Sequence, residues 1–437
     1  MPRLYLETYG CQMNVADSEL ITGALRRDGF ETTDDPGQAD VLLVNTCAIR
    51  DNAEQRVLGR MGELKRYKRP GTVLGVVGCM AQRLGPRLLE RVPQVDLVIG
   101  PDGYRGLPEL IARAQAGERA ADVALRGWEH YEDVPAGRAS GPSAFVTVQR
   151  GCDYRCTYCI VPTTRGPERS RMLTDVVREV TGLAAGGTSE VTLLGQTVNS
   201  YHDGTHDFAD LLRAVGAVPG IQRVRFTSPH PNDFSARVLA AMAETPTVCE
   251  HVHLPVQSGS SAVLKRMLRR YDRAGYLDVV TALRRAVPGL ALTTDIIVGF
   301  PGETEADFAA TLSLVEAVGF DDAYTFRYSP REATPSVRLR DAVPDAVAQD
   351  RLERLIAVVR RVAKRINIAL VGSSHDVLVE GRARRGGLLQ GRTRTNKVTL
   401  FEGPEEWIGS HRRVRLTGTT GSTFTAWPLE REPAIVG

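Results

Sequence analysis

The stretch GCDYRCTYCI, residues 151–160, holds three of the chain's seven cysteines in the spacing C-x3-C-x2-C: Cys152, Cys156 and Cys159. A disulfide needs an even number of thiols, and a tetrahedral structural zinc takes four ligands. Three thiolates instead suit a 4Fe-4S cluster that leaves one iron open to an external ligand. A zinc knuckle completed by His202 or His230 is the alternative, but no further ligand stands nearby at zinc-ribbon spacing.

The segment that contains this stretch, residues 144–340, alternates strand-like and helix-like patterns. Six runs are typical of parallel strands, at 144–151, 190–196, 223–229, 251–257, 292–300 and 323–330. Helical patterns lie between them, at 174–185, 208–218, 233–244, 262–287 and 305–318. Such units predict an α/β fold, a partial (β/α)6 TIM-like barrel whose site lies at the C-terminal mouth of the strands. The cysteine stretch directly follows the first strand and therefore lies at that mouth.

The first 127 residues form a second alternating pattern. Strand candidates lie at 3–11, 41–47, 72–79 and 95–100, with helices expected at 17–28, 50–68 and 81–92. This predicts an open parallel α/β domain. The first three strands each end in a cysteine: Cys11, Cys47 and Cys79. One such cysteine alone would be read as an apolar filler, but three at equivalent strand ends predict a second three-cysteine iron–sulfur site.

The C-terminal segment predicts a small antiparallel β-barrel of the OB-like kind. Five short β runs lie at 376–381, 388–393, 397–401, 412–420 and 423–429. A helix is expected ahead of them at 351–370, and it is rich in arginine. A lone charge run is usually a solvated face, but basic residues on a small appended barrel indicate contact with the RNA backbone. The candidates are Arg382, Arg384, Arg385, Arg392, Arg394 and Lys397.

The composition is that of an ordinary globular protein, with 42% hydrophobic and 24% charged residues and a net charge of +3. No apolar run reaches the roughly 20 residues that span a bilayer, and the N-terminus has no secretory signal. We therefore expect a cytoplasmic protein whose cysteines are thiols or metal ligands. A linker rich in Gly, Pro, Ser and Ala at 124–144 separates the first two units. The expected domains are 1–127, 138–368 and 371–435.

Several motifs carry a resemblance beyond the cysteines themselves. CDYRCTYCIVP resembles the signature of the radical S-adenosylmethionine superfamily, including the aromatic Tyr158 before the last cysteine. TYGCQMN, VNTCAIR, GCMAQ, RGPERSR, LLGQTVNSY, FTSPHP, LPVQSGS and VGFPGET resemble the methylthiotransferase family. NTCAIRDNAEQR, with its Ile49-Arg50 pair, is most similar to the branch that modifies tRNA. The likeness covers nearly the whole chain and includes a C-terminal module like the TRAM domain.

This resemblance implies two 4Fe-4S clusters and S-adenosylmethionine as cofactors. The first trio would hold the cluster that cleaves S-adenosylmethionine, and the second an auxiliary cluster that binds the sulfur to be donated. The implied substrate is tRNA with isopentenyl-adenosine next to the anticodon, converted at carbon two to 2-methylthio-isopentenyladenosine. A flavodoxin or ferredoxin would supply electrons and a separate source the sulfur, and we expect a monomer. Family members often show Arg-Pro-Gly where this chain has Arg331-Glu332-Ala333, which puts that loop's geometry in doubt.

Other residues are weaker candidates for binding the cofactor. Gly186 and Gly187 lie where the family receives the methionine amino group, or they form a helix C-cap and turn. At or past the strand ends stand Gln196, Ser228, Gln257 and Gly299, the last in a turn over the adenine. Arg165, Arg169 and Arg171 follow the cysteine loop and could contact a carboxylate or a phosphate. Cys249 is expected to be a buried apolar residue. His251 and His253 are expected to lie in the core or in the wall of the site rather than to act as ligands.

Two other functions stay open. One is a methylthiotransferase acting on threonylcarbamoyl-adenosine in tRNA or on an aspartate of a ribosomal protein. The other is a non-catalytic iron–sulfur or zinc protein that binds RNA. The basic barrel favours RNA as the partner, and the cysteine spacing favours radical chemistry.

Overall fold

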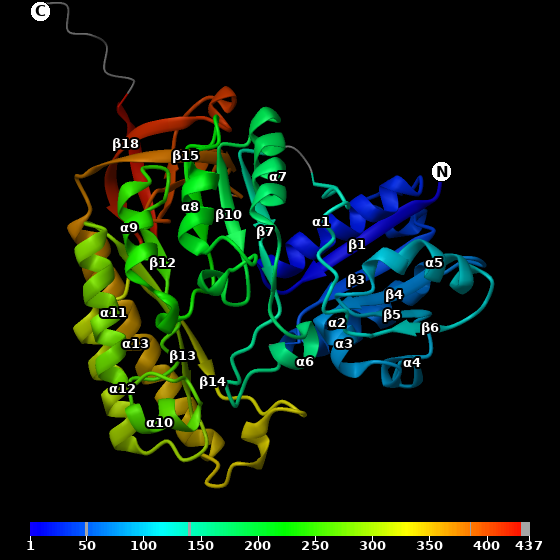
Figure 1. Cartoon of the computed structure of the whole chain (residues 1–437), viewed down its shortest axis with the longest axis horizontal. Coiled ribbons are helices and arrows are strands. Elements are labelled where there is room, and N and C mark those ends of the chain that lie inside the picture. Colours follow the sequence, from blue (N-terminus) through cyan, green and yellow to red (C-terminus); the bar gives the residue numbers. More distant parts are fainter. Residues whose placement is uncertain (49–50, 139–140, 385, 430–437) are drawn as a thin grey trace, which may run out of the picture.

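A computed structural model of the 437-residue chain describes residues 1–48, 51–138, 141–384 and 386–429. An N-terminal α/β unit lies beside a central half-barrel, and a small β-barrel closes one end of the half-barrel (Figure 1). Ile49, Arg50 and Arg385 lie outside the described residues. No helix in the described part is both long and apolar enough to span a bilayer.

The N-terminal unit is built on a six-stranded parallel sheet in the order β2-β1-β3-β4-β5-β6. The strands are β1 Arg3–Tyr9, β2 Glu31–Thr32, β3 Val41–Thr46, β4 Val73–Gly78, β5 Leu97–Ile99 and β6 Ala120–Asp122. The helices are α1 Gln12–Arg27, α2 Asp51–Leu64, α3 Cys79–Leu84, α4 Arg87–Arg91 and α5 Leu107–Gln115. The predicted parallel α/β sheet is confirmed, with β2 and β6 as additional short edge strands.

Helices bury both faces of this sheet. Because successive side chains of a strand point to opposite faces, β3 contributes to an apolar cluster on each face. Val41 and Leu43 of β3 pack in one apolar cluster with residues of α1 and α5. Leu42 and Val44 pack in another with residues of α2, α3 and α4. The helix expected at 81–92 is wrong as one element, since Gly85 adopts φ +55° and Pro86 follows, which separates α3 from α4.

The central unit confirms the six predicted strands. They are β7 Ser143–Thr147, β10 Glu190–Leu194, β11 Arg223–Phe226, β12 His251–His253, β13 Ala291–Val298 and β14 Asp322–Arg327. All their pairings are parallel. They form two three-stranded sheets, β11-β10-β7 and β12-β13-β14, which a single bridge between Val224 and Val248 connects. A short antiparallel pair, β8 Gln149–Arg150 and β9 Arg169–Ser170, flanks the cysteine loop.

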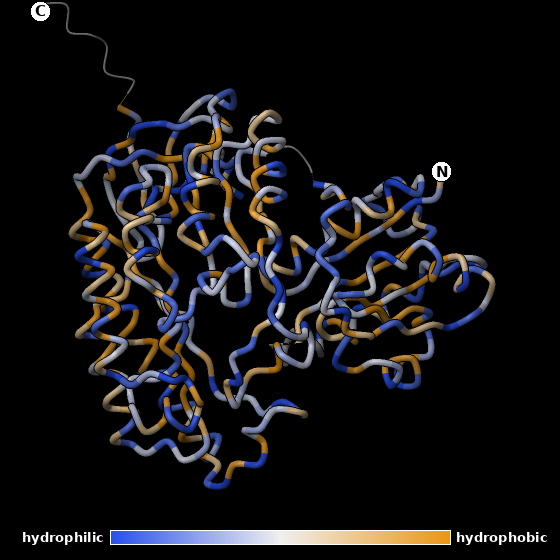
Figure 2. Tube along the Cα trace, viewed as in Figure 1, coloured by the Kyte–Doolittle hydropathy of each residue, from blue (hydrophilic) through white to orange (hydrophobic). Residues whose placement is uncertain are grey.

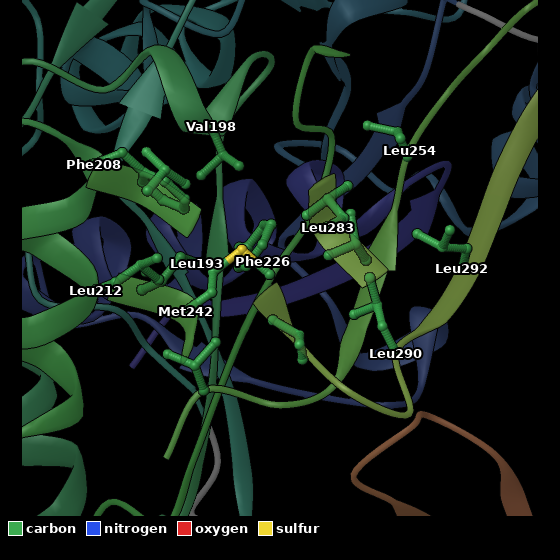
Figure 3. Packing of buried hydrophobic residues seen from close by; sticks show 14 of the residues in the cluster. Leu193, Val198, Phe208, Leu212, Phe226, Met242, Leu254, Leu283, Leu290 and Leu292 are labelled. Atoms are coloured by element: carbon green, nitrogen blue, oxygen red, sulfur yellow. The ribbon is translucent and has the colours of Figure 1, made fainter. Parts of the chain in front are cut away.

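Helices cover the outer face of these strands. They are α7 Leu173–Ala185, α8 Phe208–Gly216, α9 Ala236–Glu244, α11 Arg273–Ala286 and α12 Glu305–Val318, while the short helices α6 Val161–Arg165 and α10 Ser261–Arg266 lie outside this layer. Figure 2 shows apolar and hydrophilic residues alternating along α11 and α12, as outer helices require. Figure 3 shows the core between the strands and their outer helices, where Leu193 of β10 and Phe226 of β11 pack with Leu212 of α8. The single helix expected at 262–287 is wrong, because Leu268 and Arg270 take positive φ between α10 and α11.

The C-terminal unit is a closed barrel in the order β15-β16-β17-β19-β18. Its strands are β15 Ser374–Arg382, β16 Leu389–Thr393, β17 Val398–Phe401, β18 His411–Thr419 and β19 Thr423–Pro428, and the long helix α13, Asp345–Ala369, leads into it. The predicted barrel is confirmed, although one pairing, β17 with β19, is parallel. Short 3-10 helices lie at Pro36–Gln38, Lys65–Tyr67, Tyr104–Gly106, Val198–Ser200, Pro231–Asp233, Pro335–Arg338 and Glu405–Trp407.

Candidate iron–sulfur site

Cys11, Cys47 and Cys79 lie at one edge of the N-terminal sheet. They follow the neighbouring strands β1, β3 and β4, whose last residues are in register with one another. The backbone N–H of Cys47 donates to the Tyr9 carbonyl at 3.1 Å, which fixes the end of β3 against β1. A hydrogen bond from the Cys47 thiol, with the charge of Arg165 adding to it, lowers the pKa of Cys11 to about 6. The Cys11 thiol also donates from Sγ to Oδ1 of Asn14 at 3.4 Å.

Gly10 makes this approach possible. It adopts φ +143°, and a Cβ built there would lie 2.7 Å from the Cβ of Cys47 and 2.5 Å from Oδ1 of Asn14. Asn14 and Asn45 are fully buried and bond to each other, Nδ2 of Asn14 donating to Oδ1 of Asn45 at 3.0 Å. This pair ties the start of α1 to the end of β3. The cysteine positions are thus set by a buried polar scaffold and a residue without a side chain.

Cys152, Cys156 and Cys159 lie in the loop between β8 and α6, at the C-terminal mouth of the half-barrel. Cys156 is buried, and the other two are half-buried. Sγ of Cys152 lies 3.1 Å from Oγ1 of Thr197, and Nη1 of Arg269 donates to Sγ of Cys156 at 3.4 Å. Burial, followed by the neighbouring Cys156 sulfur, raises the pKa of Cys159 to about 12. Thiols with raised pKa values must lose protons when they ligate a metal.

The segments that carry the two cysteine trios meet at the contact between the domains. Ala48, which follows Cys47, packs with Cys79 and with Ile160, which follows Cys159. Helices α3 and α6 also lie against each other, and Figure 1 shows α6 between the half-barrel and the N-terminal sheet. In the part of the chain that is described, no group of three His, Cys, Asp or Glu side chains converges on a single metal ion. A cubane differs from one ion in placing each cysteine sulfur on a different iron.

Buried ion pairs stabilise this contact between the domains. Asp17 on α1 is fully buried and accepts from Nη1 of Arg150 at 3.0 Å and from Nη2 of Arg165 at 2.6 Å. Burial would raise the pKa of Asp17, but the two guanidinium groups hold it below its usual value. Arg165 also donates from Nε to Sγ of Cys79 at 3.3 Å. Arg169 forms a second buried ion pair across the contact, with Asp102.

The comparisons with known proteins agree with this three-part architecture. Residues 3–100 match the uncharacterized protein family UPF0004, residues 146–315 the radical SAM superfamily and residues 369–424 the TRAM domain. A tRNA-2-methylthio-N(6)-dimethylallyladenosine synthase of Geobacter sulfurreducens is 48% identical, over 95% of this chain and 94% of its own. The synthase of Porphyromonas gingivalis is 45% identical, over 97% and 94%. The chain belongs to this methylthiotransferase family.

The fold is also similar to that of a solved radical S-adenosylmethionine methyltransferase, TsrM from Kitasatospora setae. With a substrate and an analogue of S-adenosylmethionine bound, that structure aligns with a TM-score of 0.58 and 15% identity, over 83% of this chain and 89% of its own. At this identity the likeness concerns the fold alone. The radical SAM and methylthiotransferase resemblance of the sequence is therefore confirmed by the family matches and by the full-length relatives.

The predicted mouth residues of this family member are not all at the mouth. Gln196 follows β10 and is half-buried, and among the described atoms its Oε1 has no hydrogen-bond partner. Ser228 and Gln257 lie past the ends of β11 and β12 with φ of +59° and +70°, values that are strained for residues with a side chain. Gly186 and Gly187 instead cap α7 before β10 begins, at the opposite end of the strand. The C-cap and turn interpretation of these two glycines is confirmed, and their role as cofactor ligands stays a prediction.

Gly299 lies close to Tyr158 of the cysteine loop, because Tyr158 packs against the neighbouring Phe300. Gly299 follows β13 with φ +73°, and a Cβ there would lie 2.7 Å from Cβ of Ala348 on α13. Close packing against α13 is thus enough to require glycine at this position. Tyr158 packs on the apolar cluster that includes Phe300, and burial raises its pKa well above the ordinary value. In the loop that departs from the family pattern, Ala333 takes φ +76°, a conformation that glycine adopts more easily.

The structure groups His230, a candidate from the sequence, with Tyr154 and Asp233, which the sequence did not single out. Tyr154, in the cysteine loop, donates to Asp233 at 2.8 Å, and its ring stacks on His230 with centroids 3.8 Å apart. His230 is buried, and burial with the nearby Arg269 and Arg270 lowers its pKa to about 2. Its Nε2 has no partner among the atoms described. The sequence signals for this group were the place of His230 past a strand end and the position of Tyr154 between two cysteines.

The basic residues of the barrel divide into two sets. Arg394 pairs with Glu250 at 2.8 Å, and the buried Lys397 pairs with Asp321 at 2.7 Å, so both face the central unit. Their assignment to RNA stays a prediction, and these pairs within the protein do not favour it. The others point elsewhere: Arg392 pairs with Glu380, Arg382 pairs with Glu405, and Arg384 is exposed. Cys249 is buried, as expected for a filler, and so is His251, while His253 is half-buried.

Proposed function

We propose that the chain is a radical S-adenosylmethionine enzyme that methylthiolates tRNA. It converts isopentenyl-adenosine next to the anticodon to 2-methylthio-isopentenyladenosine. One observation carries the proposal: the segments that hold the two cysteine trios come from separate domains and meet at Ala48, Cys79 and Ile160. The curated relatives, which match over nearly their whole length, support the choice of substrate.

Each trio has the donor chemistry that a 4Fe-4S cluster needs. Thiolates are the soft ligands that such clusters select, and three of them leave one iron for another ligand. Cys152, Cys156 and Cys159 would hold the cluster that binds S-adenosylmethionine. Cys11, Cys47 and Cys79 would hold the auxiliary cluster. When bound, the clusters and S-adenosylmethionine supply the radical and the activated sulfur for transfer to carbon two of the adenine.

The chain's own residues position the reactants and exclude water. Gln196, Ser228 and Gln257 follow strands of the half-barrel and carry side chains that can hydrogen-bond to a bound cofactor, and Tyr158 and Gly299 are further candidates for contact with it. Gln196 Oε1, buried and unpartnered among the described atoms, fits a donor on such a ligand. The proposed domains are 1–127, 138–368 and 371–435. The proposal includes a cytoplasmic monomer with a flavodoxin or ferredoxin as reductant and a separate sulfur source.

The tRNA backbone fits a different basic surface from the one expected. Arg413 and Arg415 of β18 are exposed on one face of the barrel, and Trp427 of β19, in register with Arg415, is 56% exposed. Helix α13 ends beside this face, since Gly372 N–H donates to the Leu416 carbonyl. A groove on α13 is lined by Arg360, Arg361, Lys364, Arg365 and Ile368. Exposed arginines around an aromatic ring suit phosphates and an unstacked base.

Replacing Arg413 and Arg415 by alanine is expected to weaken tRNA binding mainly at low salt. Each lost phosphate contact reduces the slope of log affinity against log salt by roughly 0.7–0.9. The double variant should therefore lose about 1–2 from that slope, measured by filter binding across a salt series. Arg113→Ala, which removes an exposed arginine on α5, is the matched control and should leave the slope unchanged. An unchanged slope in the double variant would remove this face from the footprint.

The proposed function is tested by digesting tRNA from a strain that lacks the gene. The digest should contain isopentenyl-adenosine without its methylthio group, and restoring the gene should bring 2-methylthio-isopentenyladenosine back. Loss of a methylthio group from threonylcarbamoyl-adenosine, or from a ribosomal-protein aspartate, would favour the other branches of the family. A purified protein that binds RNA but forms no 5′-deoxyadenosine under reducing conditions would favour the non-catalytic alternative.

A further inference from the structure

Arg165 stands between the two proposed cluster sites. It is the last residue of α6, shortly after Cys159 in the chain, yet its guanidinium group reaches into the N-terminal domain. We infer that Arg165 is a positioning residue for the auxiliary cluster: it holds Cys79 from across the domain contact and raises the reduction potential of the cluster that Cys79 binds. This inference rests on the proposed function, because it takes Cys79 as a cluster ligand.

The contacts of Arg165 are specific. Nε donates to Sγ of Cys79 at 3.3 Å, and Nη2 donates to Oδ2 of Asp17 at 2.6 Å. The side chain is only 4% exposed. Nη1 is buried as well and has no acceptor among the described atoms. Because a guanidinium group presents its donors in a fixed plane, fixing two of them on Asp17 and Cys79 also fixes the direction of the third.

Arg165 joins chain segments that carry two of the three cysteines of the auxiliary site. Asp17 lies on α1, which begins directly after Cys11, and Cys79 is the first residue of α3. The same carboxylate also binds Arg150, so one negative charge is shared by two buried arginines. The excess positive charge lies next to the Cys79 sulfur. Thiolate ligands and the cluster that they hold are negatively charged, and they would balance it.

A positive charge and an N–H donor at a cluster sulfur act in the same direction. Reduction adds one electron, and both features stabilise the more negative reduced form, so both raise the reduction potential. Arg269 repeats the arrangement at the other trio, where Nη1 donates to Sγ of the buried Cys156. The difference is that Arg269 and Cys156 belong to the same domain, whereas Arg165 and Cys79 belong to different ones. Arg165 thereby links the auxiliary cluster to the docking of the two domains.

The test is a redox titration of the anaerobically loaded full-length protein, followed by electron paramagnetic resonance. Arg165→Gln should move the potential of one cluster to a more negative value and leave the other unchanged. Arg269→Gln should move the other one. Full-length protein with Cys152, Cys156 and Cys159 all replaced by alanine carries only the auxiliary cluster, and it identifies which signal belongs to it. Arg165→Lys keeps the positive charge but cannot donate to Cys79 and Asp17 from a planar guanidinium group. It should shift the potential less than Arg165→Gln.

Arg150→Gln is the matched control. Arg150 is as buried as Arg165 and binds the same carboxylate, but no contact with a sulfur is found for it in the described part of the chain. It removes one buried positive charge but no N–H donor to a sulfur, so it should shift the auxiliary potential less than Arg165→Gln and leave the other potential unchanged. An unchanged auxiliary potential in Arg165→Gln, or an equal shift in Arg150→Gln, would overturn the inference and leave Arg165 with a purely structural role. If the unmodified protein holds only one cluster, the proposed function fails instead, which iron analysis of the same sample shows.

Discussion

Replacing Cys47 by alanine is expected to abolish the methylthio product while S-adenosylmethionine is still cleaved. Cys47 is buried at the end of β3, in the auxiliary trio, and it contributes nothing to the loop that holds the first trio. The variant should retain about four of about eight irons per chain. Its rate of 5′-deoxyadenosine formation should stay within a few-fold of the unmodified protein, while 2-methylthio-isopentenyladenosine falls to background. Both products are measured by liquid chromatography with mass spectrometry.

The chain supplies its own control for this experiment. Cys249 is another buried cysteine, but it lies before β12 and outside both trios. Cys249→Ala should keep about eight irons and full product formation, at the modest stability cost of a small core truncation. Methylthio product from Cys47→Ala would contradict the auxiliary-cluster assignment. Loss of product from Cys249→Ala would show that any buried cysteine substitution disables the protein.

Replacing Asp17 by alanine is expected to give the largest loss of stability. The carboxylate is fully buried and is the partner of both Arg150 and Arg165. Removing one partner of a buried ion pair leaves charge without compensation and costs about 3–5 kcal/mol. Urea unfolding of the metal-free protein, followed by tryptophan fluorescence and circular dichroism, should show a lower midpoint for the transition that separates or unfolds the N-terminal domain.

The pH dependence of this loss follows from the lowered pKa of Asp17. A carboxyl group whose folded pKa lies below its unfolded value of 3.8 stabilises the fold fully above that unfolded value. The contribution disappears as the pH falls through the lower folded pKa. The difference between Asp17→Ala and the unmodified protein should therefore be constant near neutral pH and shrink only in strong acid. Asp133→Asn, which breaks an exposed pair between Arg105 of the N-terminal domain and the linker, should cost about 0–1 kcal/mol. Equal losses in both variants would contradict the proposed role of the buried network.

The strand ends could be predicted from the sequence because parallel strands place their carboxyl ends at one edge. Cys11, Cys47 and Cys79 were located by that rule alone, and their strands are adjacent in the sheet. The first residues of helices were harder to predict from the sequence. The helix expected from residue 17 begins at Gln12, since Cys11 itself is the N-cap, a role that cysteine rarely fills.

Charges were the part that the sequence described least well. Arg394 and Lys397 belong to a run without acidic neighbours, which is typical of an RNA-binding face. Their partners Glu250 and Asp321 lie more than 70 residues earlier and reach them only through the docking of the barrel. The sequence indicated that Arg165 could contact an anionic group, but its partners Asp17 and Cys79 come from another domain. Long-range ion pairs leave no local pattern, whereas strand ends do.

The most direct test of the central claim is the iron content and Mössbauer spectrum of protein purified and loaded without oxygen. Two trios of cysteines, each holding a cubane, predict about eight irons per chain, all in 4Fe-4S clusters. Alanine at Cys152, Cys156 and Cys159, or at Cys11, Cys47 and Cys79, should each remove half of that iron. A fully loaded protein with a single 4Fe-4S cluster, or with zinc in place of iron, would contradict the account.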